Sequence, residues 1–209
     1  MTKKIFIILV FVAIIVSECF VLYTNNDLRN EIAIKNNYLE SLSERYYASE
    51  SQFSASIADV SKIIGGTIIA NDTAGNTVLL SDIVKQFEGN NIMICRYSDR
   101  MCHQCVEHTM SVFTDNKDSI NIQNVVFLAD NPSRRNLKLS ISEYGLQESL
   151  VFNCPNLGVD AESAEFPFIL IIDKDLRVLS VYFPTKSTHG TDYDYQHVKL
   201  LYDKLIKKK

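Results

Sequence analysis

The chain has 209 residues, of which 46% are hydrophobic and 22% are charged, and its formal net charge is −4. This length fits one domain of ordinary size plus an additional segment, and the composition excludes a disordered chain and a disulfide-dense mini-protein. The mild negative charge gives no support for nucleic-acid binding, which usually requires a basic patch. The five cysteines are an odd number, which argues against a closed disulfide framework.

A nearly continuous apolar run covers residues 5–23 and follows Lys3 and Lys4. As a helix this run would be roughly 28 Å long, close to the ~30 Å hydrocarbon core of a bilayer. The flanking lysines predict a cytoplasmic N-terminus, so the rest of the chain would lie on the periplasmic side of the inner membrane. We therefore predict an uncleaved single-pass anchor over residues 1–24. A cleaved signal peptide and a lipoprotein signal ending at Cys19 are the alternatives.

Residues 25–64 contain no Pro or Gly and are rich in Glu, Ser, Asn and Ala. Alternating steps of four and three place a heptad stripe along this segment, with three polar interruptions. The stripe consists of Leu28, Ile32, Lys35, Leu39, Leu42, Tyr46, Ser49, Phe53, Ser56 and Val60. It predicts a helical stalk that ends at Gly65-Gly66, because glycine commonly follows a helix. The stalk could be a parallel coiled coil that forms a homodimer through residues 28–60, or a single amphipathic helix.

Residues 65–209 form the predicted globular domain, where short apolar runs alternate with helical patterns. The expected elements, in chain order, are a hairpin over 67–80, a helix over 81–87 with Ser81 as its cap, a buried strand over 92–97, a helix over 105–113, a buried strand over 124–129, a helix over 133–144 closed by Gly145, a short strand over 149–153, a hairpin over 168–183 and a final helix over 194–207. This order predicts an α/β domain with helices on both faces of a mixed sheet.

The sequence Cys102-His103-Gln104-Cys105 follows the first buried strand after a short polar loop and opens a helix. The free N–H groups and the dipole at a helix N-terminus stabilise an anion, so Cys102 is the predicted nucleophile with a lowered thiol pKa. Arg100 and His103 could add positive charge beside it. Cys105 lies one turn further on and can resolve a mixed disulfide, so the pair could transfer two electrons.

The strand, loop and helix over residues 92–113 resemble the active-site segment of thioredoxin-like proteins. A second landmark lies 62 residues beyond Cys105, where Phe166 and Pro167 precede the terminal hairpin. The resemblance implies a cis peptide bond at Pro167 and a bound substrate chain that pairs with the backbone of Phe166. The resemblance covers about residues 66–209. The long gap between the two landmarks is similar to that of membrane-tethered, extracytoplasmic thioredoxin-like proteins of bacteria. This subgroup includes cytochrome-maturation thiol reductases and thiol-specific-antioxidant-like domains.

The resemblance also implies an activity, which is thiol–disulfide exchange on extracytoplasmic proteins without a cofactor. In the reductase direction, electrons would come from a membrane electron donor. Three residues depart from the family pattern: Met101 and Gln104 stand where Trp and Pro are frequent, and Arg96 occupies a strand position that usually holds a buried acid or amide. The proton acceptor for the resolving thiol is then left open among Glu107, His108 and solvent.

Two other interpretations stay open on the sequence. The domain could be a non-catalytic thioredoxin-like binding module whose cysteine pair is inert. It could also handle a metal ion, because Cys102, Cys105, His103 and His108 offer sulfur and nitrogen ligands, although no second ligand pair follows at zinc-finger spacing. Cys95 is expected to be a buried small hydrophobe, and Cys154 either a third redox thiol or a packed one.

Overall fold

The structure is a computed structural model that describes residues 18, 24, 28–30, 32–37, 39–40, 49–87, 89, 91–115, 120–131, 133–184 and 191–206. The chain divides into two compact units, residues 1–50 and residues 51–209. In the first unit the described residues from 28 to 50 are helical and exposed. Apart from Glu18, the predicted anchor over 5–23 lies outside the described residues. Among the residues that are described, none belongs to a helix with the length and apolar character needed to cross a membrane.

The predicted stalk shows two different environments along its length. Leu28, Ile32 and Leu39 of the stripe are exposed in the first unit, and the predicted homodimer through residues 28–60 stays a prediction. In the second unit residues 51–59 are helical, and Ala55 and Asp59 are buried.

The stalk helix ends earlier than the sequence predicts. Ser61 adopts a left-handed backbone with φ 73°, which breaks the helix, and Ile63 then forms a β-bridge with Arg177. The predicted end at Gly65-Gly66 is therefore wrong, because the helix stops before Ser61 and Ile63 is already in extended pairing.

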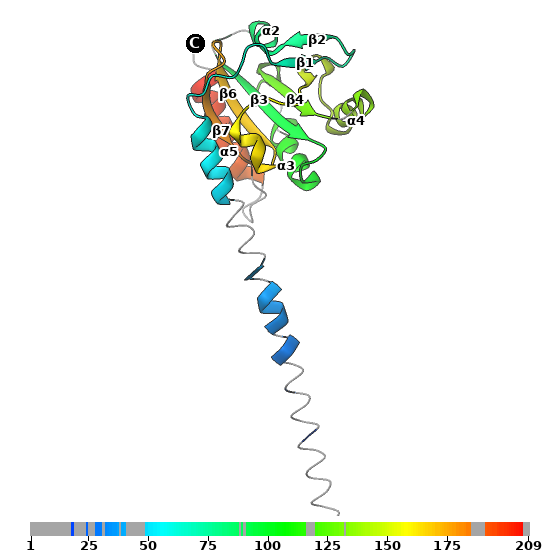
Figure 1. The fold of residues 1–209 in the computed structure, drawn as a ribbon, viewed down its shortest axis with the longest axis vertical. Coiled ribbons are helices and arrows are strands. Elements are labelled where there is room, and N and C mark those ends of the chain that lie inside the picture. The colour runs from blue at the N-terminus through cyan, green and yellow to red at the C-terminus, as the bar shows by residue number, and fades with distance from the viewer. Residues whose placement is uncertain are drawn as a thin grey trace, which may run out of the picture. The chain divides into compact units, whose positions relative to one another are not determined.

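Within the described part of the chain, the second unit contains one seven-stranded mixed sheet in the order β2-β1-β5-β4-β3-β6-β7 (Figure 1). β3, β4 and β5 pair in parallel, whereas the β1–β2 hairpin and the β6–β7 hairpin pair antiparallel. The strands are β1 (Ile69–Asn71), β2 (Thr77–Leu79), β3 (Asn91–Ser98), β4 (Val125–Asp130), β5 (Val151–Asn153), β6 (Phe168–Asp173) and β7 (Val178–Tyr182).

Helices cover both faces of this sheet, as predicted. The α-helices are α2 (Leu80–Lys85), α3 (His103–Thr114), α4 (Arg134–Tyr144) and α5 (Thr191–Leu201), and α5 continues as a π-helical turn, η4 (Tyr202–Ile206). In the part of the chain that the structure describes, short 3-10 helices complete the connections: η1 (Ile122–Asn124), η2 (Glu148–Leu150) and η3 (Asp160–Ala164).

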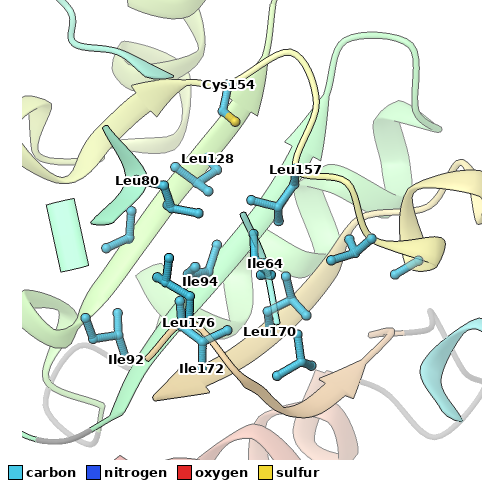
Figure 2. Close-up of a cluster of buried hydrophobic side chains, with 14 of the residues drawn as sticks. Ile64, Leu80, Ile92, Ile94, Leu128, Cys154, Leu157, Leu170, Ile172 and Leu176 are labelled. Atoms are coloured by element: carbon cyan, nitrogen blue, oxygen red, sulfur yellow. The ribbon is translucent and has the colours of Figure 1, made fainter. Parts of the chain in front are cut away.

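The core has two halves, because side chains alternate between the faces of a strand. Ile92 and Ile94 of β3 belong to the half under α2 and η3, part of which is drawn in Figure 2. Met93 and Cys95 belong to the half under α3, α4 and α5. Both central strands are buried along almost their whole length, which confirms the sequence prediction from their continuous apolar runs.

A side-chain cap is present at the start of α4 but not at the start of α2. Ser133 caps α4 by accepting a hydrogen bond from the Asn136 N–H, and Gly145 closes the helix in the left-handed conformation, as predicted. The predicted Ser81 cap is wrong. α2 begins at Leu80, and its N-cap is Leu79, whose side chain has no atom that can form a hydrogen bond. Burial of Leu80 and Ile83 holds the start of this helix instead.

Candidate redox site

The cysteine motif lies where β3 ends and α3 begins. Cys102 is exposed and is the N-cap residue of α3, while Cys105 is half-buried one turn further on. The Cys102 carbonyl accepts hydrogen bonds from the N–H groups of Cys105 and Val106, both at 3.0 Å. The thiol-bearing residue therefore sits at the helix end where backbone N–H groups lack intrahelical partners and the dipole favours an anion.

The loop before the motif is held by β4. The Ser98 hydroxyl accepts a hydrogen bond from the Arg100 N–H at 3.1 Å and donates one to the Asp130 carbonyl at 3.1 Å. The Arg100 guanidinium forms an ion pair with the Asp130 carboxylate, and this contact raises the pKa of Arg100. Arg100 therefore has an acidic partner on β4, and its expected effect on Cys102 stays a prediction.

His103, the other residue expected to add positive charge, is the first residue of α3 and is exposed. Its Nε2 atom lies 3.4 Å from a Glu107 carboxylate oxygen and 4.0 Å from one of Glu143 on α4. The three side chains could together hold a metal ion. The metal set expected from the sequence differs, because His108 is buried and bonded elsewhere.

Phe166 and Pro167 lie at the same end of β3 as the cysteine motif. β6 begins at Phe168, which pairs with Arg96 of β3, so the two preceding residues are beside the end of β3 where the loop to Cys102 begins. Pro167 is buried and Phe166 half-buried. The predicted cis bond at Pro167 is wrong: no described peptide bond is cis, and the chain turns at Glu165, whose φ is 57°.

Arg96 is buried at the strand position singled out from the sequence. Its guanidinium donates to the Glu162 carboxylate at 2.5 Å, to the Cys154 carbonyl at 2.5 Å and to the Pro155 carbonyl at 3.3 Å. Glu162, which sequence reasoning missed, also accepts the Gly158 N–H at 3.0 Å. These contacts fix the loop between β5 and β6.

A pocket of about 440 Å³ separates this loop from the residues that lead to Cys102. Its lining includes Arg96, Arg100, Met101, Asp130, Glu162 and Glu165. A second pocket, of about 340 Å³, lies toward α4 and is lined in part by Tyr97, Met101, His103 and Tyr144. Met101 lines both pockets, so the residue before Cys102 is flanked by a hollow on either side.

A second buried polar cluster lies on the opposite face of the sheet. The His108 Nε2 atom lies 2.6 Å from an Asp194 carboxylate oxygen, and both side chains are buried. The Tyr182 hydroxyl donates to the other oxygen of Asp194, and the Tyr182 ring stacks on His197. Sequence reasoning missed Asp194 and Tyr182, because no local pattern links them to His108, which precedes Asp194 by 86 positions.

The remaining described cysteines are both buried. Cys95 points into the core half under α3, and burial raises the pKa of its thiol. Burial also raises the pKa of the Cys154 thiol, although the Arg96 charge opposes the shift. A thiol kept protonated and covered is a poor nucleophile. Cys95 is therefore a buried small side chain, as predicted, and the packed alternative fits Cys154.

The central parallel strand leads into a C-x-x-C helix, a second parallel strand follows, and an antiparallel hairpin preceded by Pro167 completes the sheet. The fold is thioredoxin-like. No family profile matches the chain, and no curated protein matches its sequence.

Several solved structures are similar to the chain at low identity. A thiol:disulfide interchange protein from Bacteroides sp. is 15% identical over 70% of this chain and 90% of its own, with a TM-score of 0.40. A hypothetical protein from Sinorhizobium meliloti is 13% identical over 72% and 84%, with a TM-score of 0.48. A secreted disulfide oxidoreductase from Mycobacterium tuberculosis is 12% identical over 65% and 96%, with a TM-score of 0.42.

Proposed function

We propose that the chain is a thiol–disulfide oxidoreductase in which Cys102 is the nucleophile and Cys105 the resolving thiol. The observation that supports this function best is the position of Cys102, which is exposed at the N-cap of α3 with Cys105 one turn behind it. An exposed thiol at a helix start is the environment in which thiolates form and react. A second cysteine on the next turn allows a mixed disulfide to be resolved within the protein.

The substrates in this proposal are protein disulfides. The Phe166–Pro167 segment and the pocket beside Met101 lie next to the motif and offer a surface for an extended chain. The pair acts in the reducing direction and receives electrons from a membrane donor.

The deciding experiment compares insulin reduction by the full chain with that by Cys102→Ser, using a dithiol as the final reductant. Loss of the nucleophile should reduce turnover to the uncatalysed background. Cys154→Ala is the matched control, because this thiol is buried, and it should retain wild-type turnover. Equal, background-level rates in the wild type and in Cys102→Ser would contradict the proposal and favour the inert binding module instead.

The proposed location is the inner membrane, with residues 65–209 on the periplasmic side and residues 5–23 as the anchor. The apolar run and the preceding lysines support this orientation. In intact cells a membrane-impermeant maleimide should therefore label Cys102, and the labelled protein should sediment with membranes. Labelling that appears only after cell lysis would contradict the proposed orientation.

A further inference from the structure

Resolution of a mixed disulfide requires Cys105 to lose its proton, so a base near this thiol would matter for the proposed exchange. The residues on α3 that share a face with Cys105 are those three and four positions further along, His108 and Thr109. Helical side chains lean toward the N-terminus, which brings both of them back over the turn that holds Cys105. Glu107, another candidate from the sequence, is exposed on the outer side of α3 beside His103.

The hydrogen bonds around His108 define which ring nitrogen can accept a proton. Burial and the bond to Asp194 raise the pKa of Tyr182, so its hydroxyl stays protonated and donates to Asp194. Asp194 therefore accepts at both carboxylate oxygens, and the His108 Nε2–H is the donor to the second one. The Nδ1 atom is then the ring nitrogen that Asp194 does not engage.

Thr109 is a second, independent indication that a polar group on this face of α3 can still form a hydrogen bond. Its side chain is fully buried, and its Oγ1 atom has no hydrogen-bond partner among the described residues. Such atoms are rare in folded proteins because an unmade bond is costly. The face of α3 behind Cys105 therefore carries an imidazole, which a buried carboxylate of α5 supports, and a hydroxyl that can still form a hydrogen bond.

We infer that His108, oriented by Asp194 and Tyr182, accepts the proton of Cys105 when the mixed disulfide is resolved. This inference rests on the proposed function. The Cys105 sulfur, once its proton has moved to His108, attacks the Cys102 sulfur, forms the Cys102–Cys105 bond and breaks the bond to the substrate sulfur, which leaves as a thiolate. The pair loses two electrons to the substrate disulfide, and the proton passes from His108 to solvent or to the leaving thiolate.

The groups that face His108 support proton transfer. Asp194 of α5 lies against it and stabilises the imidazolium, Tyr182 of β7 holds Asp194 in place, and His197 stacks on the far side of Tyr182. A general base with such a partner is a common catalytic arrangement, since the second group orients the ring and compensates the positive charge.

The test separates the two sulfur reactions in time. The full chain, in a Cys19→Ser background and with the pair reduced, is mixed with a symmetrical nitrothiobenzoate disulfide whose released thiolate is yellow. The attack by Cys102 releases one coloured thiolate, and the attack by Cys105 releases a second, so two kinetic phases are expected. Cys105→Ser should show the first phase alone.

His108→Gln should retain the first phase and slow the second by roughly 10²-fold, the usual contribution of a general base. Asp194→Asn keeps the shape of the side chain but removes the compensating charge, and it should slow the second phase as well. Asp203→Asn is the matched control, because its carboxylate pairs with Lys199 on the same C-terminal helical segment, and it should leave both phases unchanged. Circular dichroism of each variant checks that the fold is retained.

The outcomes distinguish the inference from the function on which it rests. A wild-type chain without a first phase faster than Cys102→Ser would overturn both. A normal first phase with a second phase that His108→Gln and Asp194→Asn leave unchanged would overturn the role of His108 alone. Equal slowing of both phases would also overturn it, because a purely structural disturbance of α3 affects both cysteines.

Discussion

Two buried charged clusters lie near the cysteine motif, on opposite faces of the sheet, and they differ in the chemistry open to them. On the side of η3, Arg96 is bonded to Glu162 and to two backbone carbonyls. On the side of α3 and α5, His108 is bonded to Asp194, which also accepts from Tyr182. In both clusters the central side chain has hydrogen-bond partners, although the buried Nε atom of Arg96 has none among the described residues.

The two clusters differ in the side chain at their centre and in its position relative to Cys105. An arginine side chain stays protonated in proteins, so the Arg96 cluster can only fix structure, here the loop that leads from β5 into Pro167. A neutral imidazole has one acceptor nitrogen, and His108 lies one turn beyond Cys105 on α3, so its cluster can take part in the proposed proton transfer. Burial alone therefore does not mark a functional group, because the chemistry of the buried side chain decides what it can do.

The largest effect on stability is expected when Glu162 is replaced by Gln. The change leaves Arg96 buried without a counter-charge, and loss of one partner of a buried ion pair typically costs several kcal/mol. Because Glu162 is itself one-fifth exposed, with a side-chain accessibility of 20%, we expect the low end of that range, about 3 kcal/mol. Urea denaturation of the full chain measures the change.

The control for this variant is Glu165→Gln, an exposed position in the same loop that should change stability by less than about 0.5 kcal/mol. If Glu162→Gln is as stable as the wild type, Arg96 does not depend on its counter-charge. The claim that the Arg96 cluster stabilises the fold through its ion pair with Glu162 would then be contradicted.

The sequence predicted the central part of the fold because those strands and helices carry strong local signals. β3, β4 and β6 are long apolar runs, and α4 has a serine cap and a closing glycine, so local patterns specify them. The weakly marked elements were missed: η3 is short and polar, and it is held by the carboxylate of Asp59, which accepts the N–H groups of Asp160 and Ala161 at 2.8 and 2.7 Å. That contact joins residues about a hundred positions apart, which no local pattern records.

Some residues of the candidate site could likewise be placed from the sequence, and others could not. The placement of Cys102 and Cys105 follows from a short motif beside a strand, so it could be inferred locally. The partners of Arg96 and His108 could not, because each depends on a tertiary contact with a distant element. The ion pair between Arg100 and Asp130 could not be inferred locally either, since Asp130 comes from a neighbouring strand, and the influence of Arg100 on Cys102 stays a prediction.

A smaller effect, confined to alkaline pH, tests the hydrogen bond that holds Asp194 in place. Burial first, and then the bond to Asp194, raises the pKa of Tyr182 above its ordinary value of 10.0. The folded protein therefore keeps the phenol protonated at a pH where the unfolded chain loses that proton. The sign follows: this contribution to stability is fully present below pH 10 and is lost as the pH rises through the folded-state value.

Tyr182→Phe retains the ring that stacks on His197 but removes the hydroxyl. Its stability at neutral pH should fall by about 1 kcal/mol, the usual net value of one hydrogen bond. Above pH 10 its stability should decline less steeply than that of the wild type, because one buried phenol no longer favours the protonated folded state. Urea midpoints measured between neutral and alkaline pH give both values, and Tyr193→Phe, which alters an exposed ring, should follow the wild-type curve. If stability falls equally steeply with pH in Tyr182→Phe and in the wild type, the Tyr182 hydroxyl is open to solvent. Tyr182 would then not donate to Asp194, and it would not help to orient His108.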